Sequence, residues 1–257
     1  MATPVLYVFA ISHYCEKARW ALDYQSINYN IQHLPPGIHG RVAKKLGAPT
    51  SSLPILQVGT QIIQGSGNII SWAEANKAAE SPTLACDETS QLDLDGLHKL
   101  SGEEIGKRLD DVLGVHVRRY YYSEALVDYP QLVRPIFVRD LTPFQQGLTN
   151  ISWGVIRKLM ARKMDLGHSQ GLESRQLLEA ELDWLDQLLA GGGQYLIGRH
   201  LTRVDITAAS LLAPLVLPQE HPTYAGIKWS PNVAVDCETW QNRRSLQWVK
   251  EIYRKYR

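Results

Sequence analysis

The chain opens with the patterns of a strand, a helix and a second strand within its first 34 residues. Val5–Ile11 is a short apolar run rich in β-branched and aromatic residues, which is typical of a buried strand. Residues 16–25 (EKARWALDYQ) place small and apolar side chains on one helical face, and residues 27–34 (INYNIQHL) alternate as a strand does. The pattern predicts two parallel strands joined by a right-handed crossover.

The pattern continues to residue 76 and then changes. A turn and loop (PPGIHGR, 35–41) precede two short strand patterns, and Gly59-Thr60 between them is typical of a hairpin turn. Residues 66–76 indicate a helix capped by Ser66. The predicted order is therefore β-α-β-(loop or helix)-β-β-α.

From about residue 90 the strand patterns disappear and helical patterns take over. Ser101 to Glu104 form a capping box, and long amphipathic helices are predicted over 150–164 and 172–190. We therefore expect a small α/β domain of about 80 residues followed by an all-helical one, joined near residues 76–90.

Charge and cysteine content narrow the class of protein. The net charge is only +1, so composition gives no reason to expect nucleic acid or an anionic membrane as a partner. The three cysteines fit neither a disulfide framework nor a zinc site, which favours reduced thiols in a cytoplasm. The N-terminal apolar run is shorter than a signal-peptide core, and no run approaches the roughly 18 apolar residues of a membrane helix.

Four short motifs follow one another along the chain. Ser12 to Leu22 fits S-x-x-[CS]-x-x-x-R-x-A-L, and Leu53 to Leu56 fits [VL]-P-x-L. Gly65 to Ile69 approaches [DE]-S-x-x-I, and Gly198 to Asp205 fits G-x-x-x-[ST]-x-x-D. In this order and at these distances the motifs resemble the cytosolic glutathione transferase superfamily, over nearly the full length of the chain.

The resemblance implies a fold of the α/β plus all-α class. Residues 1–80 would form a thioredoxin-like, glutathione-binding domain, and residues 90–257 a helical bundle that contributes the electrophile pocket. The implied activity is conjugation of glutathione, as co-substrate, to apolar electrophiles, a chemistry of detoxification that needs no metal. The resemblance also implies a homodimer.

Ser12 is the predicted catalytic residue of this serine-type site. Glutathione must become a thiolate to attack an electrophile, and a hydroxyl at a helix N-terminus can donate a hydrogen bond to that thiolate. The partial positive charge of the helix start adds about 0.3–2 kcal/mol. Ser12 could equally serve only as a helix cap. Tyrosine-type relatives use a phenol on the first strand, but Tyr7 is one residue out of register and is left out of the site.

Cys15 is the alternative carrier of chemistry. It occupies the second position of a thioredoxin-like C-x-x-C pattern, in which the first position is the usual nucleophile and here is Ser12. A thiol in a first helical turn could be reactive, or it could be a half-buried core residue.

The glutathione-binding residues follow from the resemblance. Leu53-Pro54, with a cis peptide bond, would present a backbone edge to the peptide, and the helix start at Ser66 would receive the γ-glutamyl carboxylate. Gly65 departs from the family pattern, which has an acid there, and Gln64 could replace it in part. His39 would approach the glycyl end, with Lys44 and Lys45, or would lie on a solvated loop. The predicted binding residues are His39, Ser52, Leu53, Pro54, Gln64, Gly65 and Ser66.

The aromatic stretch His116–Leu126 would line the electrophile pocket or would only pack between helices. Two other functions remain open at this stage. One is a glutathione-dependent thiol oxidoreductase or peroxidase that uses Cys15. The other is a non-catalytic, transferase-like binding module, which the glycine at position 65 would suit.

Overall fold

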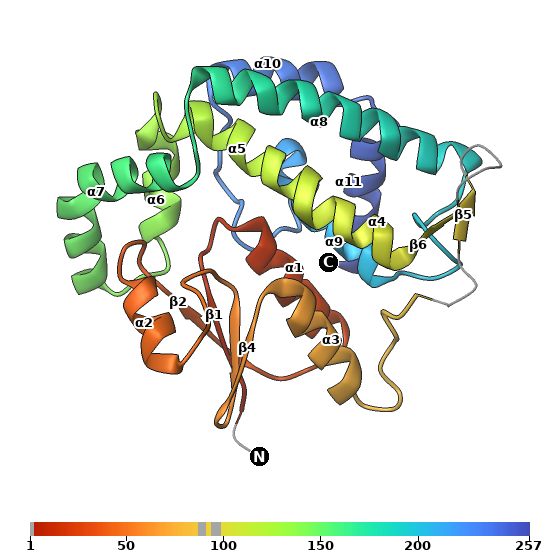
Figure 1. Cartoon of the computed structure of the whole chain (residues 1–257), viewed down its shortest axis with the longest axis horizontal. Helices are drawn as coiled ribbons and strands as arrows, with labels where there is room; N and C mark the ends of the chain where they lie inside the picture. Colours follow the sequence, from red (N-terminus) through yellow and green to blue (C-terminus); the bar gives the residue numbers. More distant parts are fainter. Residues whose placement is uncertain (1–2, 87–90, 94–98) are drawn as a thin grey trace.

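The computed structural model describes residues 3–86, 91–93 and 99–257, and it places a small sheet domain beneath a larger group of helices (Figure 1). The sheet has the order β2-β1-β3-β4. Strand β1 runs parallel to β2 and antiparallel to β3, and β3 pairs with β4. The predicted parallel pair and the hairpin at Gly59 are confirmed. The elements of this domain are β1 (Val5–Val8), α1 (His13–Tyr24), β2 (Asn30–His33), α2 (His39–Leu46), β3 (Ile55–Val58), β4 (Gln61–Gln64) and α3 (Ser66–Asn76).

The two faces of the sheet carry separate apolar layers, because neighbouring strand residues point to opposite sides. Leu6 and Val8 of β1 pack with the apolar residues of α1 and α3. Tyr7 points to the other side, towards Ala43 of α2, and its hydroxyl donates to Gln57 Oε1 at 2.8 Å. Tyr7 is therefore part of the sheet's packing, as its register predicted.

The second part of the chain is helical apart from one short hairpin. Strands β5 (Gln91–Asp93) and β6 (Lys99–Ser101) pair antiparallel, whereas the sequence predicted no strand in this half. Three residues per strand are too few to produce a visible alternation. Residues 87–90 of the predicted join lie outside the described residues. The helices are α4 (Gly102–Arg108), α5 (Gly114–Ala125), α6 (Pro130–Val138), α7 (Pro143–Lys163), α8 (His168–Leu188), α9 (Arg203–Val216), α10 (Pro231–Trp240) and α11 (Arg244–Tyr256).

Side-chain caps begin several of these helices, and the one at Ser101 was predicted from the sequence. Ser101 with Glu104, and Thr202 with Asp205, form complete capping boxes at α4 and α9. Helix α3 differs, because its N-cap is Gly65 and no side chain caps it. The prediction of a Ser66 cap is wrong by one residue.

A π-helical turn, Leu109–Leu113, joins α4 to α5 and also meets the sheet domain. The main-chain oxygen of Asp110 accepts a hydrogen bond from the Tyr14 hydroxyl at 2.7 Å. The Asp110 carboxylate receives the buried Lys17 ammonium, also at 2.7 Å. Because Tyr14 and Lys17 are on α1, these bonds fix the helical domain against the helix that begins at Ser12.

Helix α7 exposes an apolar stripe. Its residues recur every three or four positions on the side opposite the buried Trp153 and Ile156, and the most exposed of them retain 80% and 87% of their surface. The stripe consists of Phe144, Leu148, Ile151, Val155 and Leu159.

Candidate functional site

A cleft of about 270 Å³ lies where the sheet domain faces the helical domain. Its sheet-domain wall comes from the end of β1, the start of α1, the start of α2 and the loop before β3. Its helical wall comes from α5, α6 and α7. The wall residues are Phe9, Ile11, Ser12, His13, Tyr14, Pro36, His39, Ser51, Ser52 and Leu53 on one side, and Arg118, Tyr122, Phe137, Met160, Lys163 and Met164 on the other.

Ser12 lies at the turn between β1 and α1 and faces this cleft. It is the N-cap of α1, and its hydroxyl oxygen accepts the backbone N–H of Cys15 at 3.3 Å. A hydroxyl that accepts from the helix still has its own hydrogen to donate. Capping and donation into the cleft are therefore compatible in one residue.

Cys15 is buried instead of lining the cleft. Its side chain is 1% exposed and packs in the core layer between the sheet and α1. Burial raises the pKa of its thiol to about 11, against a weaker lowering effect of the Ser12 hydroxyl. A thiolate at Cys15 is thus rare near neutral pH, which makes it a poor nucleophile in the folded protein.

The loop before β3 forms the polar edge of the cleft. The Leu53-Pro54 peptide bond is cis, as predicted, and Ser52 and Leu53 line the cleft. Pro54 is buried, and its carbonyl accepts the Gly65 N–H at 3.0 Å. This bond sets the start of α3 directly beside the cis-proline segment.

Gln64, Gly65 and Ser66 lie next to the cleft and not in its wall. The Gln64 amide bonds to both sides of the loop, accepting from Thr50 N at 3.0 Å and donating to Ser52 O at 2.7 Å. It therefore braces the loop. Gly65 has φ +92°, a conformation that strains any other residue. Ser66 is the buried first residue of α3.

His39 is half-buried at the start of α2 and does not lie on a solvated loop, so that alternative is wrong for His39. It is the first residue of α2, its Nδ1 accepts the Gly37 N–H at 3.1 Å, and its ring meets Phe9 edge-on at 4.8 Å. Burial, with a smaller effect of Lys163, lowers the pKa of the imidazole. Lys44 and Lys45 are exposed in the last turn of α2, away from the cleft wall.

The tyrosines of α5 divide between the two roles that the sequence left open. Tyr122 lines the cleft and stacks with Phe137 at 6.3 Å. Tyr120 packs on Trp240 and donates to Asp236 at 2.5 Å, which is ordinary helix packing. Lining and packing are both represented.

Sequence reasoning included Arg118 only as part of the stretch His116–Leu126, with no role of its own, and it missed the residues contributed by α6 and α7. Arg118 and Tyr122 are four residues apart, and so are Met160 and Met164, so each pair shares one helix face. The spacing shows that the members of each pair lie on the same side of a helix, but it does not indicate that this side faces the sheet domain.

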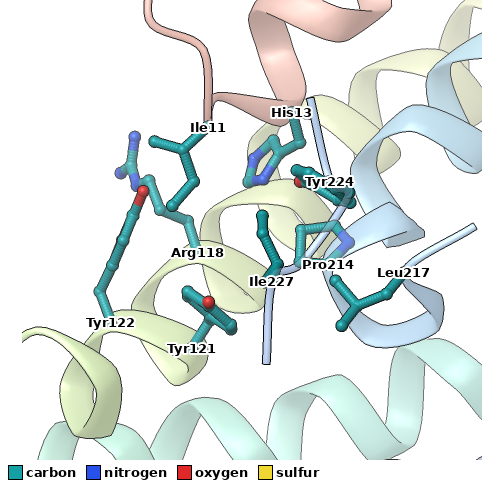
Figure 2. A pocket seen from close by; sticks show the side chains of 9 residues that line it. All are labelled: Ile11, His13, Arg118, Tyr121, Tyr122, Pro214, Leu217, Tyr224 and Ile227. Atoms are coloured by element: carbon teal, nitrogen blue, oxygen red, sulfur yellow. The ribbon is translucent and has the colours of Figure 1, made fainter. Parts of the chain in front are cut away.

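A smaller cavity of about 10 Å³ lies behind the cleft (Figure 2). It has room for about one water molecule. The His13 ring points into it, and Ile11, Arg118 and Tyr122 border both cavities. Three buried polar atoms in its lining have no protein partner among the described residues: His13 Nε2, Arg118 Nε and the Tyr121 hydroxyl. Burial, and then the Arg118 charge, lower the pKa of His13 to about 3.

Residues 6–81 match the family model described as the N-terminal domain of glutathione S-transferases. Residues 6–81 are therefore similar in sequence to the N-terminal domain of glutathione S-transferases. Its matched span runs from β1 past α3, so it contains the turn at Ser12, the cis-proline loop and the helix start at Ser66. No curated protein matches the chain in sequence.

Solved glutathione transferase structures are similar in fold to this chain over its whole length. Glutathione transferase GSTFuA3 from Phanerochaete chrysosporium is 15% identical, with a TM-score of 0.64 over 100% of this chain and 98% of that one. A glutathione S-transferase of Ceriporiopsis subvermispora, solved in complex with glutathione, is 14% identical, with a TM-score of 0.63 over 99% and 98%. The β-etherase LigF from Sphingobium sp. strain SYK-6 is 15% identical, with a TM-score of 0.56 over 97% and 99%. The chain thus has the glutathione transferase fold, a thioredoxin-like domain followed by helices.

The described residues of this glutathione transferase-like chain contain no cluster of His, Cys, Asp and Glu side chains that could hold a metal ion. None of the described helices combines the length and the apolar character needed to cross a bilayer.

Proposed function

We propose that the chain is a serine-type glutathione transferase. It binds glutathione along the loop before β3 and the start of α3, and it transfers the tripeptide to an electrophile held against the helical wall. The observation that carries the proposal is the Ser12 hydroxyl, which lines the cleft at the start of α1 and accepts the backbone N–H of Cys15. The neighbour solved in complex with glutathione supports the choice of ligand.

Ser12 would act on the ionisation of the bound thiol. The glutathione thiol releases its proton to solvent, and the Ser12 O–H donates to the sulfur that remains. The thiolate sulfur then forms a bond to an electrophilic carbon, and the leaving group departs with the electron pair. Hydrogen bonds to charged groups contribute about 1.5–3 kcal/mol, which corresponds to lowering the thiol pKa by about 1 to 2.

The peptide would be held by backbone groups more than by side chains. The edge beside Leu53 can pair with an extended peptide, and the free N–H groups at the start of α3 suit the γ-glutamyl carboxylate. Gln64 already braces the loop, so the γ-glutamyl amino group would lack the acidic partner usual in the family. We therefore expect binding that is weaker than an acid at position 65 would give.

Replacing Ser12 tests the role of its hydroxyl. Ser12→Ala should raise the apparent pKa of bound glutathione by about 1 to 2 and slow conjugation at pH 7 by tenfold or more. Glutathione affinity should change little, because the peptide is held elsewhere. Thiolate absorbance against pH, conjugation rates and calorimetry measure the three quantities. Cys15→Ser is the matched control and should leave conjugation intact; an unchanged pKa in Ser12→Ala would make Ser12 only a cap.

Ser12→Cys should change the chemistry instead of only weakening it. A thiol at a helix start has a lowered pKa and can form a mixed disulfide with glutathione, which a hydroxyl cannot do. We expect less conjugation and new glutathione-dependent disulfide reduction. If the wild type already reduces disulfides and Cys15→Ser abolishes this, the thiol oxidoreductase or peroxidase is the better assignment.

A non-catalytic binding module is the second candidate, and Gly65 together with the engaged Gln64 favours it. Calorimetry with reduced glutathione at millimolar concentration separates it from the transferase. No binding there would remove the enzyme assignment.

The assembly and the compartment belong to the same proposal. We expect a homodimer in a cytoplasm, because the three cysteines are unpaired and the fold's relatives commonly pair. Light scattering and fractionation test these expectations.

A further inference from the structure

The cleft contains positive charge and no acid. Of its lining residues, Arg118 and Lys163 are cationic, and none is Asp or Glu. We propose that the electrophile carries a carboxylate or a similar anionic group, and that Arg118 binds it. This inference rests on the proposed transferase function and names the substrate class of the same site.

Arg118 has no ion-pair partner within the part of the chain that the structure describes. Among the described residues it forms no ion pair, and its Nε is buried without a hydrogen-bond acceptor. Several other half-buried arginines are engaged, for example Arg108 with Glu181 at 2.9 Å and Arg175 with Asp236 at 2.6 Å. Arg19 Nε is also buried without an acceptor, but Arg19 does not line the cleft. A guanidinium that is partly withdrawn from water without a counter-ion is costly, and a bound anion would remove that cost.

The acids nearest in sequence on the same helical segment already have partners. Asp110 pairs with Lys17, Asp111 pairs with Lys107 at 2.8 Å, and Glu124 accepts the Ser230 hydroxyl at 2.6 Å and the backbone at the start of α10. None of the three can turn towards Arg118 without leaving those partners. The anion would have to come from a ligand.

The two cations of the cleft lie towards different parts of it. Lys163 Nζ donates to Ser51 Oγ at 3.1 Å, beside the edge proposed for the peptide. The Lys163 charge also helps to lower the pKa of His39. The charge of Arg118 lowers the pKa values of His13, Tyr14 and Tyr122, against or beside the larger effect of burial. Figure 2 shows the Arg118 side chain extending towards Ile11 at the turn before α1. Lys163 therefore suits glutathione, and Arg118 suits the second substrate.

The surroundings of Arg118 define the rest of the electrophile. Ile11, Tyr122 and Phe137 are apolar or aromatic, and two methionines of α7 complete the wall. Aromatic faces and methionines accept flat apolar bodies of varied outline. The structure fits a planar apolar electrophile with a carboxylate at one end, because a guanidinium binds a carboxylate through two parallel hydrogen bonds.

The test compares an acid with its neutral ester. Glutathione displaces chloride from 4-chloro-3-nitrobenzoate and from its methyl ester: the sulfur–carbon bond forms, and chloride leaves with the electron pair. Each enzymatic rate is divided by the uncatalysed rate. We expect Arg118→Gln to lower kcat/KM for the acid roughly 10- to 100-fold more than for the ester. Arg118→Lys should retain part of the preference. Arg162→Gln is the matched control, because Arg162 is an exposed cation of α7 outside the cleft wall.

A binding measurement keeps the inference testable apart from turnover. Calorimetry should show that Arg118→Gln weakens the binding of S-(4-carboxybenzyl)glutathione more than the binding of S-benzylglutathione. Equal losses for both compounds, or for acid and ester, would overturn the inference. A matching loss of affinity for glutathione itself would also overturn it by assigning Arg118 to the peptide. If wild type binds neither glutathione nor these conjugates, the transferase proposal fails first.

Discussion

His13 shows how one buried side chain links the cleft to pH. It lies between the turn at Ser12 and the small inner cavity, and its Nε2 has no protein partner among the described residues. Burial lowers the pKa of the imidazole to about 3, whereas an unfolded histidine has a pKa of about 6.5. The folded chain therefore keeps His13 neutral at pH values where the unfolded chain binds a proton.

The sign of the resulting pH effect is fixed. Stability due to His13 is complete above about pH 6.5 and is lost as the pH falls from there towards 3, because only the unfolded state gains the proton. Between pH 7 and pH 5 the loss should be about 2 kcal/mol. Urea unfolding should show a smaller difference between these pH values in His13→Gln than in wild type. His168→Gln is the control, because His168 is exposed; an equal pH difference in His13→Gln and wild type would contradict the assignment.

Several site residues were predictable because their geometry is local. Ser12 follows a strand and precedes a helix, so its place at the turn can be predicted from the sequence, and the cis-proline loop follows from the family motif. The helix cap at residue 66 failed by one position, because a glycine at positive φ replaced a side-chain cap. Arg118 and Lys163 could not be predicted, since their position in the cleft depends on how α5 and α7 pack against a distant domain.

At the scale of elements, one ion pair joins the π-helical turn to α1, between the buried Lys17 and the partly exposed Asp110. Lys17 has only 2% of its side chain exposed, and burial lowers the pKa of its ammonium against the opposing effect of Asp110. Gly114 contributes to the same contact, because a Cβ there would lie 2.6 Å from the Tyr14 hydroxyl oxygen. The two domains therefore meet with little room for adjustment.

Removing the acid should show how far the fold depends on this ion pair. Asp110→Asn leaves the Lys17 charge buried without a counter-ion, and we expect a loss of about 3–5 kcal/mol in the free energy of unfolding. Asp111→Asn is the matched control, because Asp111 pairs with Lys107 on the surface and its loss should cost under about 1 kcal/mol. Denaturant unfolding measures both variants, and similar small losses would mean that Lys17 finds another partner or water.

For the whole molecule, the apolar stripe of α7 bears on the expected dimer. Two antiparallel copies of α7 would bring Ile151 against its own equivalent and bury residues that are otherwise in water. We expect Ile151→Glu to reduce the molar mass in light scattering from that of a dimer to that of a monomer. Val235→Glu is the control, because Val235 is exposed outside the stripe. A dimer that survives Ile151→Glu would have to use another face.

The extra residue of the π-helical turn also decides which way α5 aims. One residue added to or removed from an α-helix rotates everything after it by about 100°. Arg118 and Tyr122 follow the turn on the same continuous helical segment, which Figure 1 shows as one rod from α4 to α5. Without the inserted residue they would be rotated by about 100° about the helix axis relative to α4. A single insertion or deletion in this short turn would therefore change which residues of α5 line the cleft. Evolution or an engineer could alter the cleft in this way without replacing any of its side chains.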